Sequence, residues 1–169
     1  MSEIAGAVER ASAYLTDHPD EARYRDSVAR ARLGAGLRVD VSGPGGEALQ
    51  TDMPSGIGGG ASAPSPGWYF RAAAASCVAA LIGIRAAAQG LALPPGSVEV
   101  TVDSESDDRG ILGLDDAIPA GVLALRIVVA LTNASADRAA FEEVARWAVQ
   151  HCPVTDTAAR AVPIELEIS

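Results

Sequence analysis

The sequence predicts an α+β fold in which antiparallel strands are grouped around two central helices. Residues 29–53 and 98–131 carry runs of alternating apolar and polar residues, a pattern typical of half-buried strands. Residues 68–89 and 136–150 instead have apolar residues at helical spacing. The strands do not alternate regularly with helices as they do in a parallel doubly wound sheet. With 169 residues the chain has the size of one domain.

Residues 1–26 are expected to form a helical extension to the main domain, which spans residues 27–169. Four apolar residues recur at helical spacing: Ile4, Ala7, Ala11 and Leu15. This helix is expected to end before Pro19, because the residue that precedes a proline disfavours the α conformation.

The main domain is expected to begin with a β-hairpin and a third strand. Two alternating runs flank Gly34 and Gly36, the first with Ala29, Ala31 and Leu33 and the second with Leu37, Val39 and Val41. Residues 47–53 follow a turn at residues 43–46 and complete the predicted sheet.

A loop is predicted between this sheet and the first central helix. Residues 42–67 contain eight glycines and four prolines in 26 positions. A phosphate-binding loop is excluded, because no GK[ST] follows and Ala61 breaks the GxGxxG spacing. The remaining interpretations are a flexible loop and a backbone nest that binds a ligand anion.

The first central helix is expected to start at Pro66 and to end at Gly90. Its buried stripe is predicted to consist of Ala73, Ala74, Cys77, Ala80, Leu81 and Ile84. The uncharged run between Arg71 and Arg85 has 13 residues, which is too short to span a bilayer.

The second half is expected to contain two strands, the second central helix, a short helix and a final strand. Val98, Val100 and Val102 alternate with polar residues, residues 122–131 are almost continuously apolar, and residues 103–108 form a solvated acidic turn without calcium-loop spacing. Ser135 is expected to cap a helix that buries Ala140, Val144, Trp147 and Ala148. Pro153 is expected to open a short helix to Arg160, and the alternation of Val162, Ile164, Leu166 and Ile168 predicts the final strand.

The charge balance argues against nucleic-acid and anionic-membrane partners. The chain has 13 basic and 22 acidic residues and a net charge of −9. All basic residues are arginine, so Schiff-base chemistry and the P-loop lysine are excluded. We therefore expect no nucleic-acid and no membrane partner.

The protein is expected to be cytoplasmic, because residues 1–15 lack the pattern of a secretory signal. In that compartment two cysteines 75 positions apart are either inert core thiols or redox groups. Together with His18 and His151 they do not have the spacing of a zinc site, so no metal is expected.

Cys77 and Cys152 are the candidates for chemistry. Apolar surroundings raise a thiol pKa, so Cys77 has a simple alternative interpretation as a small core hydrophobe. Cys152 directly precedes Pro153, where free backbone N–H groups favour a thiolate, although an inert thiol is also possible. An imidazole–thiolate pair with His151 is a further alternative, because neighbours along a chain need not face each other.

The order of these features resembles the OsmC/Ohr family of thiol-dependent hydroperoxide reductases. The matching pieces are the glycine-rich loop ending in PSPG, the helix RAAAASCVAALIGIRAAAQG, the strand SVEVTV with its acidic turn and Arg109-Gly110, and HCPV before the last short helix. The resemblance covers residues 27–168. It implies an OsmC-like fold and an intertwined homodimer with two sites.

By this resemblance, Cys77 is the peroxidatic cysteine and Cys152 the resolving one. The Cys77 thiolate would reduce an organic hydroperoxide, become a sulfenic acid and condense with Cys152 to a disulfide. A lipoyl-type dithiol would restore the pair, and no cofactor would be needed.

Two departures from the family pattern imply a weak reductase. The glutamate that follows the proline at the start of the cysteine helix is replaced by Gly67. In the family it pairs with an arginine from the early strands and holds the cysteine as thiolate. Arg38 is the nearest candidate for that arginine, but the alternation places it away from the face expected to pack on the helix.

Two further hypotheses remain open. One is a non-catalytic OsmC-like protein that binds a small lipophilic ligand in an alanine-lined cleft beside Cys77. The other is a thiol redox sensor. Bound apolar compound without turnover would favour the first of these, and loss of peroxide together with dithiol would favour the reductase.

Overall fold

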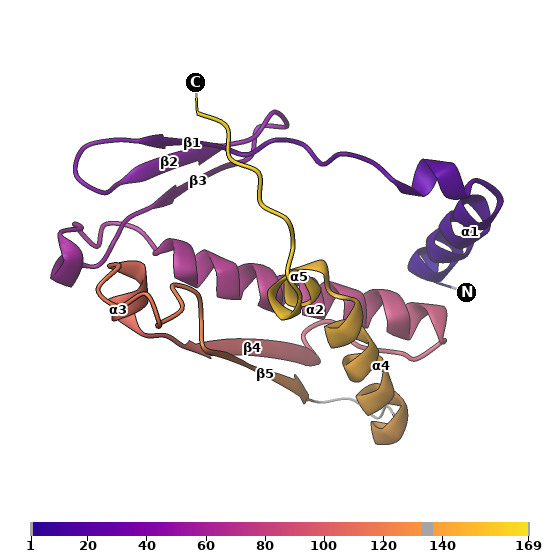
Figure 1. Cartoon of the computed structure of the whole chain (residues 1–169). Coiled ribbons are helices and arrows are strands. Elements are labelled where there is room, and N and C mark those ends of the chain that lie inside the picture. The colour runs from indigo at the N-terminus through magenta and orange to yellow at the C-terminus, as the bar shows by residue number, and fades with distance from the viewer. Residues whose placement is uncertain (1, 133–136, 169) are drawn as a thin grey trace. The chain divides into compact units, whose positions relative to one another are not determined.

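The computed structural model describes residues 2–132 and 137–168, and it confirms the predicted α+β class (Figure 1). The elements in chain order are α1 (Glu3–Asp17), η1 (Pro19–Ala22), β1 (Arg30–Leu33), β2 (Val39–Ser42), β3 (Ala48–Thr51), η2 (Ser55–Ile57), α2 (Pro66–Ala88), β4 (Val98–Glu105), α3 (Asp108–Ile111), β5 (Ala124–Leu131), α4 (Arg138–His151) and α5 (Pro153–Ala159). They form two compact units, one comprising residues 12–70 and the other the remainder of the chain.

The unit of residues 12–70 contains the predicted hairpin and third strand. β1, β2 and β3 form an antiparallel sheet in that order. Val41 of β2 lies opposite Ala31 on one side and Leu49 on the other. Gly36 has φ 65° in the turn between β1 and β2, a conformation that glycine adopts without steric cost.

The other unit is built on the antiparallel ribbon of β4 and β5, in which Val100 lies opposite Val129. The β4 side chains alternate between half-buried and exposed, as the sequence predicts. On the exposed face Arg126 lies 3.4 Å from Asp103. An exposed pair of this kind contributes little to stability.

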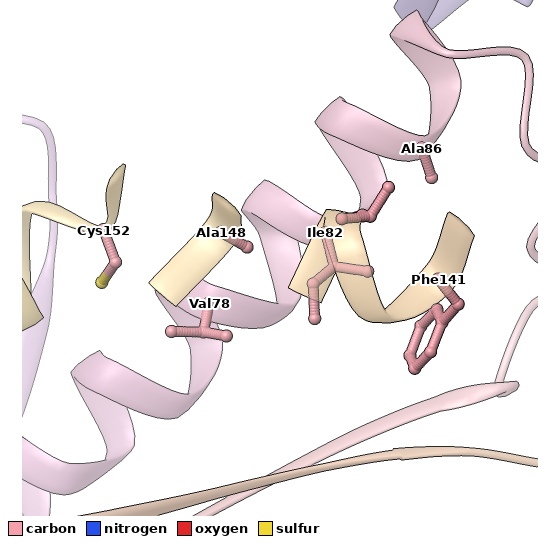
Figure 2. Packing of buried hydrophobic residues seen from close by; sticks show 7 residues of the cluster. Val78, Ile82, Ala86, Phe141, Ala148 and Cys152 are labelled. Atoms are coloured by element: carbon pink, nitrogen blue, oxygen red, sulfur yellow. The ribbon is translucent and has the colours of Figure 1, made fainter. Parts of the chain in front are cut away.

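A hydrophobic core fills the space between α2, α4 and one face of the β4–β5 ribbon. Its buried members are Val78, Ile82, Ala86, Phe141, Val144, Ala148 and Cys152. Figure 2 shows the side chains of α2 and α4 meeting in this cluster. Half-buried strand residues such as Val100 and Val129 pack against it.

The prediction for the buried stripe of α2 is partly wrong. The buried residues are Ala74, Val78, Ile82 and Ala86, which follow each other at intervals of four. Ile84 is instead among the exposed large apolar residues. Cys77 is half-buried and packs against the margin of the core. Because the helix is apolar on nearly all sides, its sequence did not distinguish the buried face.

By length and apolarity alone, α2 could span a membrane. A helix in the core of a water-soluble domain can have the same length and apolarity. The helix carries Arg71 and Arg85, and its buried face packs on α4 and on the β4–β5 ribbon. The packing favours a core helix.

The start and the buried face of α4 differ in part from the prediction. Asp137 caps the helix by accepting a hydrogen bond from the Ala139 N–H at 2.9 Å. The predicted cap, Ser135, lies outside the described residues. Val144 and Ala148 are buried as predicted, whereas Phe141 is fully packed in place of Ala140.

The acidic residues 103–108 form more regular structure than the predicted turn. β4 continues to Glu105, and Asp107 caps the one-turn helix α3 by accepting from the Arg109 N–H at 3.0 Å. In the part of the chain that the structure describes, no group of histidine, cysteine, aspartate and glutamate residues is arranged to hold a metal ion.

The predicted final strand is not formed. Residues 161–168 are extended without pairing to another strand, and Ile164, Leu166 and Ile168 are among the most exposed apolar side chains. An alternating pattern shows only that a segment can bury one face in a sheet. The described chain supplies no neighbouring strand to this segment.

The loop between β3 and α2 is ordered around the buried carboxylate of Asp52. This side chain accepts hydrogen bonds from the Met53, Gly60 and Ser62 N–H groups and from the Ser62 hydroxyl, at distances of 2.7–3.3 Å. The loop N–H groups that a nest would turn toward a ligand anion therefore bind a carboxylate of the chain itself. This finding argues against the nest interpretation, whereas the predicted loop is present.

We predict that Asp52→Asn destabilises the protein at neutral pH and makes its stability less dependent on acid. Hydrogen bonds from Ser62, Gly60 and Met53 lower the pKa of Asp52 from 3.8 to about 2. A lowered carboxyl pKa gives stability that is present above the unfolded pKa and is lost as the pH falls through the folded one. Urea unfolding should show the gap between wild type and variant narrowing from pH ~5 to pH ~3.

The matched control is Asp26→Asn, which removes an exposed carboxylate from the same unit. It should leave the urea midpoint unchanged. A gap between wild type and Asp52→Asn that stays constant with pH would show that the carboxylate charge does not hold the loop.

Candidate active site

Cys77 and Cys152 come together at one end of the core, 75 positions apart in the chain. Cys77 lies in the middle of α2, and Cys152 is the residue at which α4 ends and α5 begins. Cys152 is completely buried, next to Val78 and Ala148 in Figure 2, whereas Cys77 is half-buried. Both are free thiols.

The turn between α4 and α5 follows from the sequence His-Cys-Pro. Cys152 has extended backbone, φ −73° and ψ 120°, as expected before a proline. Pro153 then starts α5, and the Thr155 hydroxyl donates to the Val149 carbonyl oxygen at 2.6 Å. This hydroxyl ties the start of α5 to the end of α4 and thereby fixes Cys152 between them.

The two thiols lie close enough to shift each other's pKa, and backbone N–H groups at the start of α5 act on them as well. The Val154 N–H lowers the pKa of both thiols, and the Thr155 N–H lowers that of Cys152 only. The direction of the Cys152 shift agrees with the sequence-based expectation that N–H groups after Pro153 favour its thiolate. The sequence pattern did not identify Thr155, because the role of this hydroxyl depends on how two helices meet.

The pKa values of the two thiols shift in opposite directions. Burial, the hydrogen bond with Cys152 and the negative charge of Cys152 raise the pKa of Cys77 to about 11. Burial also opposes ionisation of Cys152, but hydrogen bonds from the Thr155 and Val154 N–H groups and from Cys77 outweigh it and lower its pKa. Of the two thiols, Cys152 is therefore the one that loses its proton more readily.

His151 does not form a pair with Cys152. Its ring stacks on Trp147 with centroids 4.2 Å apart, and its Nδ1 lies 2.8 Å from the Trp147 carbonyl oxygen. The Arg85 guanidinium lies 4.9 Å from the centre of the same indole ring. The imidazole is thus part of an exposed stack on α4, which argues against the imidazole–thiolate alternative.

Within the described chain, the residues that shift the pKa of Cys77 are Cys152 and Val154. No arginine is among them. Arg71, on the same helix, donates to the Ser104 hydroxyl at 3.2 Å. Arg38 is exposed just before β2, consistent with the alternation in its strand. Gly67, in the first turn of α2, has no carboxylate to offer.

A shallow groove of about 260 Å³ lies on the unit of residues 12–70. It is lined by residues 27–29, 41–43 and 47–49, which are mostly apolar and include Glu47. The groove contains neither cysteine. It therefore does not correspond to the alanine-lined cleft of the ligand-binding alternative.

Comparisons with known proteins place these features in a family. The sequence profile of the family described as OsmC-like protein matches residues 58–167, which is more than half of the chain and includes both cysteines. No match is found among curated protein sequences.

Solved structures of the same fold come from several bacteria. An OsmC-like protein from Mycoplasma pneumoniae is similar with a TM-score of 0.65, at 13% identity over 81% of this chain and 89% of that one. An organic hydroperoxide resistance protein OsmC from Legionella pneumophila has a TM-score of 0.58, at 23% identity over 79% and 89%. The organic hydroperoxide resistance protein OhrB of Bacillus subtilis has a TM-score of 0.56, at 18% identity over 79% and 90%.

The profile match and the shared fold agree with the resemblance seen in the glycine-rich loop, the cysteine helix and the HCPV segment. The chain belongs to the OsmC-like protein family.

Proposed function

We propose that the protein reduces organic hydroperoxides through its two cysteines. The observation that carries the proposal is the contact between two free thiols at the margin of the core. A half-buried thiol can meet a small reagent, and a buried thiol in contact with it can then form a disulfide. Two proteins of similar structure, from Legionella pneumophila and Bacillus subtilis, are organic hydroperoxide resistance proteins. Their names support this substrate class.

In the first step the Cys77 sulfur attacks the outer oxygen of the hydroperoxide. The O–O bond breaks, the alcohol leaves, and Cys77 becomes a sulfenic acid. The Cys152 thiolate then attacks the Cys77 sulfur, which forms the disulfide and releases hydroxide, and a solvent proton converts the hydroxide to water. A dithiol, lipoyl-type by the family resemblance, reduces the disulfide and restores both thiols.

Turnover should be slower than in family members with a glutamate at the position of Gly67. A carboxylate–arginine pair stabilises a thiolate and the charge that develops on the peroxide, and Gly67 supplies no such carboxylate. The pKa of Cys77, raised by burial and by Cys152, points the same way.

A steady-state assay with tert-butyl hydroperoxide and dihydrolipoamide tests the proposal. Peroxide and dithiol should disappear in equal amounts. If neither is consumed and the protein instead retains an apolar compound after purification, the ligand-binding alternative replaces the reductase. We place this reaction in the cytosol, where a dithiol pool keeps both thiols reduced.

The protein is proposed to act as a homodimer. The exposed apolar residues of the C-terminal segment 161–168 alternate with Glu165 and Glu167. β1 is an edge strand in which Arg30 and Arg32 alternate with Ala31 and Leu33. A segment from one copy that paired along β1 of a second copy would join opposite charges on one face and apolar residues on the other.

We predict a dimer in light scattering at micromolar concentration, and its loss in Leu166→Asp. The aspartate places a charge among the apolar residues of the paired face, where it has no partner. The control Leu114→Asp makes the same change at an exposed leucine outside the C-terminal segment and should remain dimeric. A stable monomer of wild type with an intact core, or a dimer that Leu166→Asp leaves intact, would contradict the pairing.

A further inference from the structure

We propose that Thr155 is a positioning residue for the resolving step, in which Cys152 attacks the oxidised Cys77. The inference rests on the proposed reductase function and assigns a role to a residue other than the two thiols. It is carried by the placement of the Thr155 hydroxyl, which lies 2.6 Å from the Val149 carbonyl oxygen and 3.0 Å from the Cys152 carbonyl oxygen. These contacts connect the end of α4 to the first turn of α5, with Cys152 between them.

The need for this hydroxyl follows from Pro153. In a continuous α-helix the carbonyl of residue i accepts from the N–H of residue i+4, so the Val149 carbonyl would accept from residue 153. Proline has no N–H, which leaves this carbonyl without its helical donor. The Thr155 hydroxyl supplies a donor from two residues further along, in a half-buried position where an unpaired carbonyl is costly. The hydroxyl therefore closes the gap in hydrogen bonding that the proline creates.

This connection fixes the direction of the Cys152 side chain. Cys152 joins α4 to α5 through an extended backbone, so the direction of its side chain depends on the angle between the two helices. Its carbonyl oxygen accepts from the Asp156 N–H at 2.9 Å as well as from the Thr155 hydroxyl, which also binds the end of α4. Cys152 is thus anchored to both helices. Its side chain is completely buried next to Val78 and Ala148 (Figure 2).

The two steps of the reaction depend on this anchor to different degrees. Attack on the peroxide requires Cys77, which is held by α2. In the second step the Cys152 thiolate bonds to the Cys77 sulfur, the S–O bond of the sulfenic acid breaks, and hydroxide leaves. This attack must be in line with the bond that breaks, and a misplacement of about 1 Å can cost on the order of 100-fold in rate. Loss of the Thr155 hydroxyl should therefore slow the second step and spare the first.

A single turnover with tert-butyl hydroperoxide separates the two steps. Thr155→Val and Thr155→Ala remove the hydroxyl, Thr155→Ser keeps it, and Thr157→Val is the matched control at an exposed position of α5. Samples quenched at intervals are analysed by mass spectrometry, which distinguishes thiol, sulfenic acid and disulfide. We expect Thr155→Val and Thr155→Ala to form the sulfenic acid at the wild-type rate and the disulfide about 10- to 100-fold more slowly. Thr155→Ser and Thr157→Val should match wild type in both steps.

A second measurement follows the same attack without peroxide. One equivalent of dithiobis(nitrobenzoate), an aromatic disulfide, reacts with the half-buried Cys77 and releases a coloured thiolate. Attack of Cys152 on the resulting mixed disulfide releases a second thiolate and forms the Cys77–Cys152 disulfide. The second release should be slowed by the same factor in Thr155→Val and absent in Cys152→Ser, which calibrates the signal. The slowing should persist at alkaline pH, where Cys152 is fully ionised.

Three results would overturn the inference and leave the reductase function intact. The first is a second step as fast in Thr155→Val and Thr155→Ala as in wild type. The second is an equal slowing of both steps, or loss of the folded core in both variants, because the hydroxyl would then be a requirement of the fold. The third is a slowing that disappears at alkaline pH, because the hydroxyl would then act on the ionisation of Cys152.

Failure of the reductase function would give a different result. Wild type would then form no sulfenic acid with peroxide, whereas the second thiolate release would still be slower in Thr155→Val than in wild type. That combination would leave Thr155 as the positioning residue for disulfide formation and remove the peroxide as the oxidant.

Discussion

Cys77→Ser is expected to abolish the consumption of organic hydroperoxide. A serine hydroxyl ionises far above neutral pH and does not form a sulfenic acid, so the first step has no substitute nucleophile. We expect no replacement by Cys152, since its side chain has no exposed surface. Dihydrolipoamide oxidation dependent on tert-butyl hydroperoxide should fall to the rate without enzyme.

The matched control is Ser76→Ala, at the neighbouring position on α2. Ser76 is exposed, and its hydroxyl donates to the Ala73 carbonyl oxygen at 3.1 Å, so its removal leaves the thiols undisturbed. Turnover in this variant should equal that of wild type. If Cys77→Ser retains activity and Cys152→Ser loses it, the roles of the two cysteines are exchanged. If neither substitution changes peroxide consumption, the reductase proposal fails.

Local patterns in the sequence were sufficient to predict most of the secondary structure. The alternation around Val41 and Val100 identified strands that the structure contains, and Pro66 and Pro153 each start a helix as predicted. These signals depend on residues close together in the chain. The predicted final strand failed because pairing depends on a partner strand, which the pattern of residues 162–168 does not specify.

The candidate site divides in the same way. The sequence offered both cysteines as candidates, and it gave the N–H groups after Pro153 as a reason for Cys152 to ionise. The opposite pKa shifts of the two thiols could not be predicted, because they arise from the contact between α2 and the start of α5. Asp52 was missed for a similar reason, since its partners Gly60 and Ser62 are brought to it only by the folded loop.

Two isoleucines on α2 show where periodicity was insufficient. The sequence predicted that Ile84 would be buried, whereas the structure buries Ile82 completely and leaves Ile84 37% exposed. The two residues are two positions apart, so they point in nearly opposite directions from the helix. In a helix rich in alanine and other apolar residues, either face satisfies the pattern.

Ile82→Ala is therefore expected to destabilise the protein by about 2–5 kcal/mol, the usual cost of emptying a buried isoleucine site. Ile82 lies in the same buried cluster as Val144 and Phe141 of α4. Because these neighbours are closely packed, they do not fill the space that the substitution vacates. Urea unfolding should report a much lower midpoint with an unchanged slope.

Ile84→Ala removes the same atoms from the same helix and should cost about 1 kcal/mol or less. Folding removes less apolar area from water at Ile84 than at Ile82, so the substitution loses less burial energy. The higher helix propensity of alanine offsets part of that loss. Both variants must be measured at one protein concentration, because burial in a dimer makes stability depend on concentration. If Ile84→Ala proves the more damaging variant in the monomer, α2 is rotated from the described position. The placement of Cys77 at the margin of the core would then be wrong as well, because both residues are fixed by the same rotation of this helix.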